Sequence, residues 1–172
     1  MFEIGRCVCY RAEGVCRITD IREESFGTST KTLYYVLTPV HDEKSTVYVP
    51  TDNELLVSRM RALLTAKEIC ELVESLREVR MDWIPESRAR NAKFREILGD
   101  GDRDALIVLL LTLLDRAGEG GKKPSTVDEN AARRAKKLLL EEFSATTDLS
   151  TEEDLVRFLR GEILCGDKKE SK

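Results

Sequence analysis

The first third of the chain alternates apolar and polar residues in short runs. Cys16 and Ile18 alternate with Arg17 and Thr19, as expected of a strand with one buried face. Turn residues separate runs of this kind, which are rich in Val, Tyr, Ile and Thr. The pattern predicts strands at 6–10, 14–24, 32–38 and 45–49, and a short fifth strand at 55–57.

Five short strands joined by tight turns predict a small barrel. We expect residues 1–60 to form a domain of the Tudor-like or SH3-like type. Full closure would remove both sheet edges, but five strands are few for that, so we expect one edge to stay open.

From about Thr65 the apolar positions recur with the period of a helix. Thr65 to Glu68 has the T-x-x-E pattern of a capping box and predicts a helix that ends near Arg80. A second such box, Ser150 to Glu153, predicts the start of the last helix, which ends near Gly161. The remaining expected elements are a hinge at 57–64, helices at 86–98, 102–116 and 128–143, and a loop at 118–125.

The chain is therefore predicted to be an α+β protein of two domains. A compact all-helical domain of about five helices is expected over residues 61–172, with a polar tail from about Gly166.

The charge of the chain limits any contact with nucleic acid to local surfaces. The formal net charge is −4, and non-specific affinity for DNA comes from neutralised phosphates. Two runs nevertheless hold several basic residues and no acid, at 88–95 and 133–137. A solvated helix face explains the first run equally well, and pairing such as Lys137 with Glu141 is the favoured explanation of the second.

Neither membrane insertion nor export is predicted. The longest apolar stretch, 105–114, is shorter than the roughly 20 residues that span a bilayer, and the N-terminus lacks the pattern of a signal peptide. We expect a cytoplasmic protein whose five cysteines stay reduced, without disulfides. Cys7 and Cys9 form a close pair, but the further ligands of a zinc site are missing, so no metal or cofactor is expected.

The chain offers little catalytic chemistry. His41 is the only histidine and falls in a predicted turn, where solvation explains it better than a role as a base. A glycine-rich stretch ends in Gly121-Lys122, but Lys123 stands where a phosphate-binding loop requires Ser or Thr. We therefore expect no enzyme.

Trp83, the only tryptophan, lies between two predicted helices and just before the first basic run. It could join the helices as a core residue. It could equally project as an aromatic wedge beside Arg88, Arg90 and Lys93, a combination that unstacks bases at a minor groove and contacts the neighbouring phosphates. The residues alone leave both interpretations open.

Motifs along most of the chain resemble a known family of bacterial transcription regulators, the CarD and CdnL family. Its N-terminal polymerase-interacting module is shared with the transcription-repair coupling factor. Because this chain ends before any helicase motor, we expect a separate regulator. The motifs that resemble the N-terminal module are Phe2-x-Ile4-Gly5, Val8-x-Tyr10, Gly14-Val15, Tyr34 to Leu37 and Val47 to Pro50. Those similar to the clostridial and bacillary branch are Met81 to Ile84, Arg95 to Leu98, Gly101-Asp102, Gly121 to Lys123, Asp128-Glu129 and Ala135 to Phe143.

The resemblance implies two binding partners. The Tudor-like domain would bind the β subunit of RNA polymerase. The helical domain would set Trp83 into the minor groove at the upstream edge of the promoter bubble, without sequence specificity, and stabilise the open complex. Family members contact phosphate through basic residues after the tryptophan, which implies this role for Arg88, Arg90 and Lys93.

The barrel departs from the family pattern at three positions. Arg11 and Glu13 stand where proline and histidine are frequent, and Tyr48 replaces a common arginine. Since strand addition works through main-chain bonds, we expect the polymerase surface at Tyr48 with Val47 and Val49. We expect a monomer. The alternative is a Tudor-like protein-interaction adaptor that does not bind DNA and buries Trp83.

Overall fold

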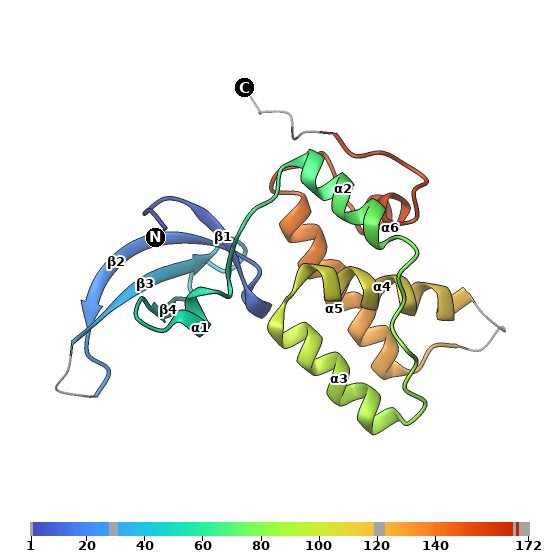
Figure 1. Ribbon diagram of the computed structural model, residues 1–172, viewed down its shortest axis with the longest axis horizontal. Coiled ribbons are helices and arrows are strands. Elements are labelled where there is room, and N and C mark those ends of the chain that lie inside the picture. Colours follow the sequence, from blue (N-terminus) through green and yellow to red (C-terminus); the bar gives the residue numbers. More distant parts are fainter. Residues whose placement is uncertain (1, 28–30, 119–122, 167, 169–172) are drawn as a thin grey trace. The chain divides into compact units, whose positions relative to one another are not determined.

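The computed structural model describes residues 2–27, 31–118, 123–166 and 168 (Figure 1). The chain divides into two compact units, Met1–Leu63 and Leu64–Lys172. The first contains an antiparallel sheet and the second is helical, so the expected α+β order is confirmed. Residues 119–122 of the expected glycine-rich loop, and most of the polar tail, lie outside the described residues.

The sheet unit is built around one long strand. β2 (Val15–Glu24) pairs first with β1 (Cys7–Tyr10) and over most of its length with β3 (Thr32–Pro39). A register shift between Ile18 and Asp20 marks a β-bulge, which bends a strand and lets it serve two partners. β4 (Val47–Pro50) and β5 (Met60–Ala62) complete the order β4-β3-β2-β1-β5.

The sheet has two edges. Among the described strands the ladder ends at β4 on one side and at β5 on the other, and no pairing joins these two. Closure into a Tudor-like barrel therefore stays a prediction. A curved sheet is nevertheless consistent with its single apolar core, which consists of Val8, Tyr10, Cys16, Ile18, Tyr35, Leu37, Val49 and Met60.

The expected strand at 55–57 is wrong. These residues belong to the short helix α1 (Glu54–Val57), because the side chain of Asn53 accepts a hydrogen bond from the Leu56 N–H at 3.1 Å and caps a helical turn. The fifth strand is β5, which pairs with β1 and lies within the stretch expected to be a hinge. Three consecutive apolar residues fit a turn of helix or a strand equally well, so periodicity could not decide.

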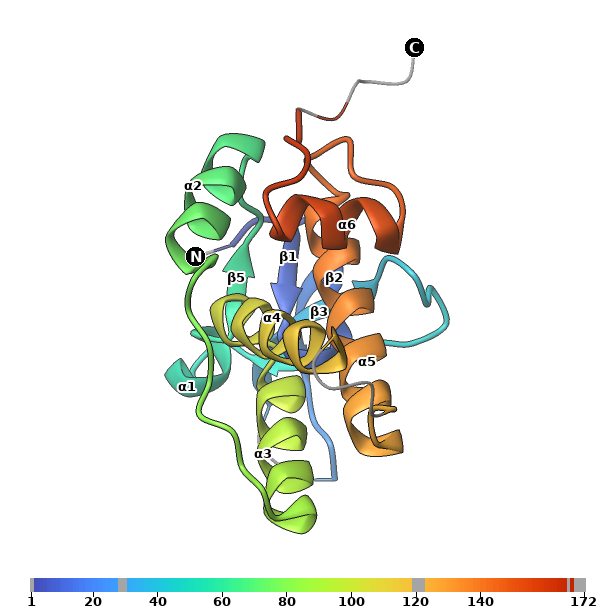
Figure 2. The ribbon, with the colours of Figure 1, turned by 90° about the vertical axis from the view of Figure 1, so that its right-hand side faces the viewer.

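Five helices follow among the described residues of the second unit: α2 (Ala66–Leu76), α3 (Ser87–Asp100), α4 (Arg103–Gly118), α5 (Thr126–Phe143) and α6 (Glu152–Leu159). The middle of α4 is apolar on every side, which is typical of a helix enclosed by others. α3 and α5 run side by side, and α4 starts at the end of α3 and crosses α5 (Figures 1 and 2). None of the helices in the described residues is long and apolar enough to cross a membrane.

The helix ends follow local capping. The capping box predicted at Thr65 and Glu68 is present, with Thr65 accepting from the Glu68 N–H and Glu68 from the Thr65 N–H. α3 continues past Gly99 and ends at Gly101, whose φ of 64° is the left-handed conformation that glycine adopts at low cost. The last helix is capped by Thr151 and not by Ser150, one residue later than expected.

The capping box predicts a measurable loss of stability for Thr65→Ala. Removing the hydroxyl leaves the Glu68 N–H without its partner, and loss of such a cap costs about 1 kcal/mol of unfolding free energy. Ser75→Ala is the matched control, since the Ser75 hydroxyl binds only the Leu72 carbonyl within the same helix. Urea unfolding followed by circular dichroism measures both. Equal midpoints for the two variants would contradict the capping assignment.

Candidate functional site

Trp83 lies in the irregular segment that joins α2 to α3. Two contacts fix this segment to α4 just before the tryptophan: the Met81 N–H donates to Thr112 Oγ1 at 3.1 Å, and the Arg80 guanidinium pairs with Asp115. A segment held in this way presents its side chains in a defined direction. The position of Trp83 is therefore set by contacts far apart in the sequence.

A buried guanidinium fixes the same segment on the other side of Trp83. Arg90, on α3, is only 6% exposed. Its Nε lies 2.9 Å from Asp128 Oδ1, and its Nη1 donates to the carbonyls of Ile84 (3.0 Å) and Pro85 (3.1 Å). Arg90 thus links α3, the tryptophan segment and α5, because Asp128 belongs to α5.

The indole ring of Trp83 lies beside two cations. The Arg90 guanidinium carbon is 4.6 Å from the ring centroid and that of Arg116 is 3.7 Å away. Trp83 itself is half-buried and packs against the helical core, whereas Arg116 is exposed. Cations at these distances are attracted to the indole face. We call Trp83, Arg90 and Arg116 the tryptophan corner.

The structure separates the basic residues that the sequence grouped together. Arg88 and Arg90 are two positions apart on α3 and so point about 200° apart around the helix axis. Arg88 is exposed, and no carboxylate pairs with it among the described residues. Lys93 is exposed but pairs with Glu96 at 2.9 Å. The Nε and Nη1 donors of Arg90 are engaged inside the protein, in contrast to the exposed side chain of Arg88.

The cap of α3 adds a fixed negative charge near Arg88. The carboxylate of Glu86 accepts hydrogen bonds from the backbone N–H groups of Ala89 and Arg88. These bonds, the one from Ala89 foremost, lower the pKa of Glu86. Glu86 therefore stays ionised and offsets part of the positive charge at this end of the helix.

Arg116 is the member of the corner that sequence analysis missed. It lies on α4, 33 positions after Trp83, at the end of a helix whose apolar residues gave no indication of a site. Only the crossing of α4 over the tryptophan segment brings the two side chains together. No local pattern in the sequence predicts this contact.

The sheet unit carries a second candidate site, a cluster of aromatic side chains. The Tyr48 ring lies 4.9 Å from that of Phe26 and 6.1 Å from that of Tyr34, and Phe26 and Tyr34 are 5.4 Å apart, all in edge-to-face geometry. Phe26 is 57% exposed. Together with Arg22, whose guanidinium lies 5.8 Å from the Tyr48 ring centroid, these residues form what we call the aromatic patch.

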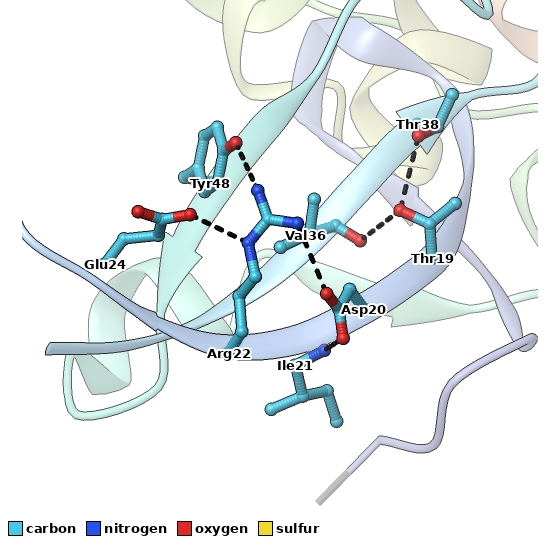
Figure 3. A network of polar contacts seen from close by, with 8 residues as sticks. All are labelled: Thr19, Asp20, Ile21, Arg22, Glu24, Val36, Thr38 and Tyr48. Atoms are coloured by element: carbon cyan, nitrogen blue, oxygen red, sulfur yellow. Dashed lines mark hydrogen bonds and ion pairs between the residues drawn. The ribbon is translucent and has the colours of Figure 1, made fainter.

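Arg22 holds the patch in place (Figure 3). Its Nη2 donates to the Tyr48 hydroxyl at 3.0 Å, and its other nitrogens reach Glu24 (2.8 Å) and Asp20 (3.3 Å). The hydrogen bonds to Glu24 and Asp20 raise the pKa of Arg22, so it remains a cation under all ordinary conditions. Strands β2, β3 and β4 thus contribute side chains to one face of the sheet.

The three residues expected to contact polymerase do not face the same way. Val49 is fully buried in the sheet core and Val47 packs against that core, while Tyr48 lies on the other face in the aromatic patch. The Thr51 N–H donates to the Leu33 carbonyl at 2.9 Å, which sets the alternation of this antiparallel ladder. By that alternation the main-chain groups of Tyr48 point to the open edge of β4.

The described residues contain no group of three or more His, Cys, Asp or Glu side chains that could hold a metal ion. His41 is an exposed turn residue, as the sequence predicts. Both candidate sites consist of aromatic rings and guanidinium groups, which are frequent in binding surfaces.

Comparison with known proteins assigns the sheet unit. No curated protein matches the chain, but residues 2–61 match the family model described as the CarD-like/TRCF RID domain. These residues coincide with the unit Met1–Leu63. This domain family is one of RNA polymerase-interacting domains, which ties the chain to transcription. The N-terminal unit of the chain is therefore similar to the CarD-like/TRCF RID domain, and residues 62–172 lie outside the match.

Proposed function

We propose that the protein is a transcription regulator that binds the β subunit of RNA polymerase and the upstream edge of the promoter bubble. On this proposal it acts as a monomer and stabilises the open complex. The observation that carries the proposal is the match of residues 2–61 to an RNA polymerase-interacting domain family. The tryptophan corner supports the second half, because it supplies an aromatic ring and cations in one place.

The polymerase surface is proposed to be the open edge of β4 with the aromatic patch. An exposed strand edge can add a strand of a partner through main-chain bonds, whatever the side chains on it, as in a Tudor-like domain that takes up a β-subunit strand. Tyr and Arg are frequent among the residues that dominate binding energy; Tyr48 lies on the edge strand, and the Arg22 side chain reaches its hydroxyl from β2. Tyr48 then contributes both its main chain and its ring.

The DNA contact is proposed at the tryptophan corner and Arg88. The Trp83 ring would enter the minor groove at the fork, where unstacked bases offer it a surface. Arg116 would leave the ring and turn to a phosphate, which its exposed place on α4 allows. Lys93 would exchange Glu96 for a phosphate, whereas Arg90 would stay in place as the support of the segment.

A second candidate function is a protein-interaction adaptor that does not bind DNA. The packing of Trp83 against the helical core favours it, since a ring used only for packing needs no exposed face. The two functions differ in one respect that can be measured. Only the regulator requires Trp83 for the lifetime of promoter complexes.

The aromatic patch predicts that Tyr48→Ala weakens binding of the full chain to the polymerase β subunit by about thirtyfold, the effect of losing roughly 2 kcal/mol at an interface. Leu55→Ala, at an exposed residue outside the patch, should bind as the wild type does. Biolayer interferometry with an immobilised β fragment gives both constants. Equal affinities for the two variants would show that the aromatic patch is not the polymerase-binding surface. If the wild type does not bind either, the β subunit is not the partner.

The tryptophan corner predicts that Trp83→Ala shortens the lifetime of the promoter open complex by about tenfold, equivalent to about 1.4 kcal/mol. Because the ring is half-buried, the variant should also lose roughly 2 kcal/mol of unfolding free energy, less than a fully buried tryptophan would. Challenge of preformed complexes with heparin, at a temperature where circular dichroism shows the variant folded, measures the lifetime.

Val79→Ala is the control for this experiment, since Val79 is an exposed apolar residue of the same inter-helix segment. It should leave the lifetime unchanged. If Trp83→Ala complexes also last as long as those of the wild type, the wedge is refuted and the adaptor function is favoured.

A further inference from the structure

Two cysteines of the helical unit face each other at short range. Cys70 lies on α2 and Cys165 in the segment that follows α6, 95 positions later in the chain. Their sulfur atoms are 3.1 Å apart and are not bonded. A disulfide bond has a length of about 2.05 Å, so the sulfurs need to approach by only about 1 Å more.

The position of Cys165 results from contacts on both sides of it. Ile163 packs against the helical core. On the other side, the Gly166 N–H donates to Asp148 Oδ1 at 2.8 Å and the Gly166 carbonyl accepts from the Asp148 N–H at 3.0 Å. The Cys165 side chain itself is partly buried against the core beside Cys70. The meeting of the two thiols is thus built into the fold of the unit.

We propose that Cys70 and Cys165 form a reversible thiol–disulfide modification site, oxidised by a low-molecular-weight disulfide. One cysteine, as its thiolate, attacks the reagent and forms a mixed disulfide, which releases the first thiol of the reagent. The other cysteine, as its thiolate, attacks that protein sulfur and expels the second. One S–S bond is broken and one is formed, the reagent is reduced to two thiols, and these take up the two protons from the cysteines.

The environment of the pair suits a site that is reduced at rest. Burial, followed by the hydrogen bond shared with Cys70, raises the pKa of Cys165 to about 12. That thiol is protonated near neutral pH, so the pair persists as a dithiol until a reagent engages one of the sulfurs. Disulfides of this kind in a reducing compartment are typically transient and redox-sensing.

The bond would join the first helix of the unit to the segment after its last helix. Such a link restricts the unfolded chain most when the enclosed loop is long, and this loop spans nearly the whole unit. Oxidation should therefore raise the thermal midpoint of the helical unit by at least about 5 °C. The site is independent of the proposed function, since it concerns neither the tryptophan corner nor the aromatic patch.

The test is to incubate the full-length protein with oxidised glutathione, alkylate the remaining thiols and map the peptides by mass spectrometry. The proposal predicts a peptide pair joined through Cys70 and Cys165, lighter by two hydrogen atoms, which dithiothreitol separates. Cys7→Ser, at a half-buried cysteine of β1, should give the same pair. The Cys165→Ser variant lacks the second thiol that expels glutathione, so the mixed disulfide on Cys70 should persist.

Two results would overturn the site. One is glutathione held stably on Cys70 in the wild type while Cys165 stays open to alkylation. The other is alkylation of both cysteines under conditions in which Cys165→Ser takes up glutathione. A thermal midpoint that does not rise on formation of the mapped bond would refute its stabilising effect. The joined peptide pair and the first overturning result are both read on the wild-type chain, so they stay decisive even if a variant fails to fold.

Discussion

The arrangement of the helical unit around Trp83 depends on one buried cation. The Arg90 guanidinium donates to the carbonyls of Ile84 and Pro85, pairs with Asp128 of α5 and lies against the indole ring. A buried guanidinium is costly unless its donors are paired, so these bonds are required together. Removing either Arg90 or Asp128 would leave the other charge buried without its partner. The segment that presents Trp83 is thereby coupled to the packing of α3 against α5.

The proposed function assigns polymerase binding to the sheet unit and the DNA contact to the helical unit. On this proposal, a chain with a net charge of −4 would have little general affinity for DNA by itself. Attachment to polymerase turns a weak DNA contact into one made at an effective concentration near millimolar. A contact that favours the melted junction over closed duplex then shifts the equilibrium toward the open complex by the difference in affinity alone. In the proposed function the sheet unit would supply the attachment and the tryptophan corner the difference in affinity.

Sequence patterns predicted most of the fold because they are local. The alternation in β2 and the capping box at Thr65 each depend on a few neighbouring residues. The patterns failed where a cap or a distant contact decides between helix and strand. The Asn53 cap makes α1 a helix, and pairing with β1 makes β5 a strand. For the candidate sites, the basic run at 88–95 suggested a single DNA-binding surface. In the structure, however, Arg90 is buried and pairs with Asp128. Arg116 and the partners of Tyr48 come from other elements, and only tertiary structure brings them together.

The most direct test of the account is a double-variant cycle on the lifetime of the promoter open complex. Tyr48→Ala, Trp83→Ala and the combination are compared with the wild type at one subsaturating protein concentration. If attachment by the sheet unit makes the DNA contact effective, Trp83→Ala shortens the lifetime in the wild-type background and has almost no further effect once Tyr48 is replaced. Effects that simply add would contradict the account, because they would show that the helical unit acts on DNA without attachment to polymerase.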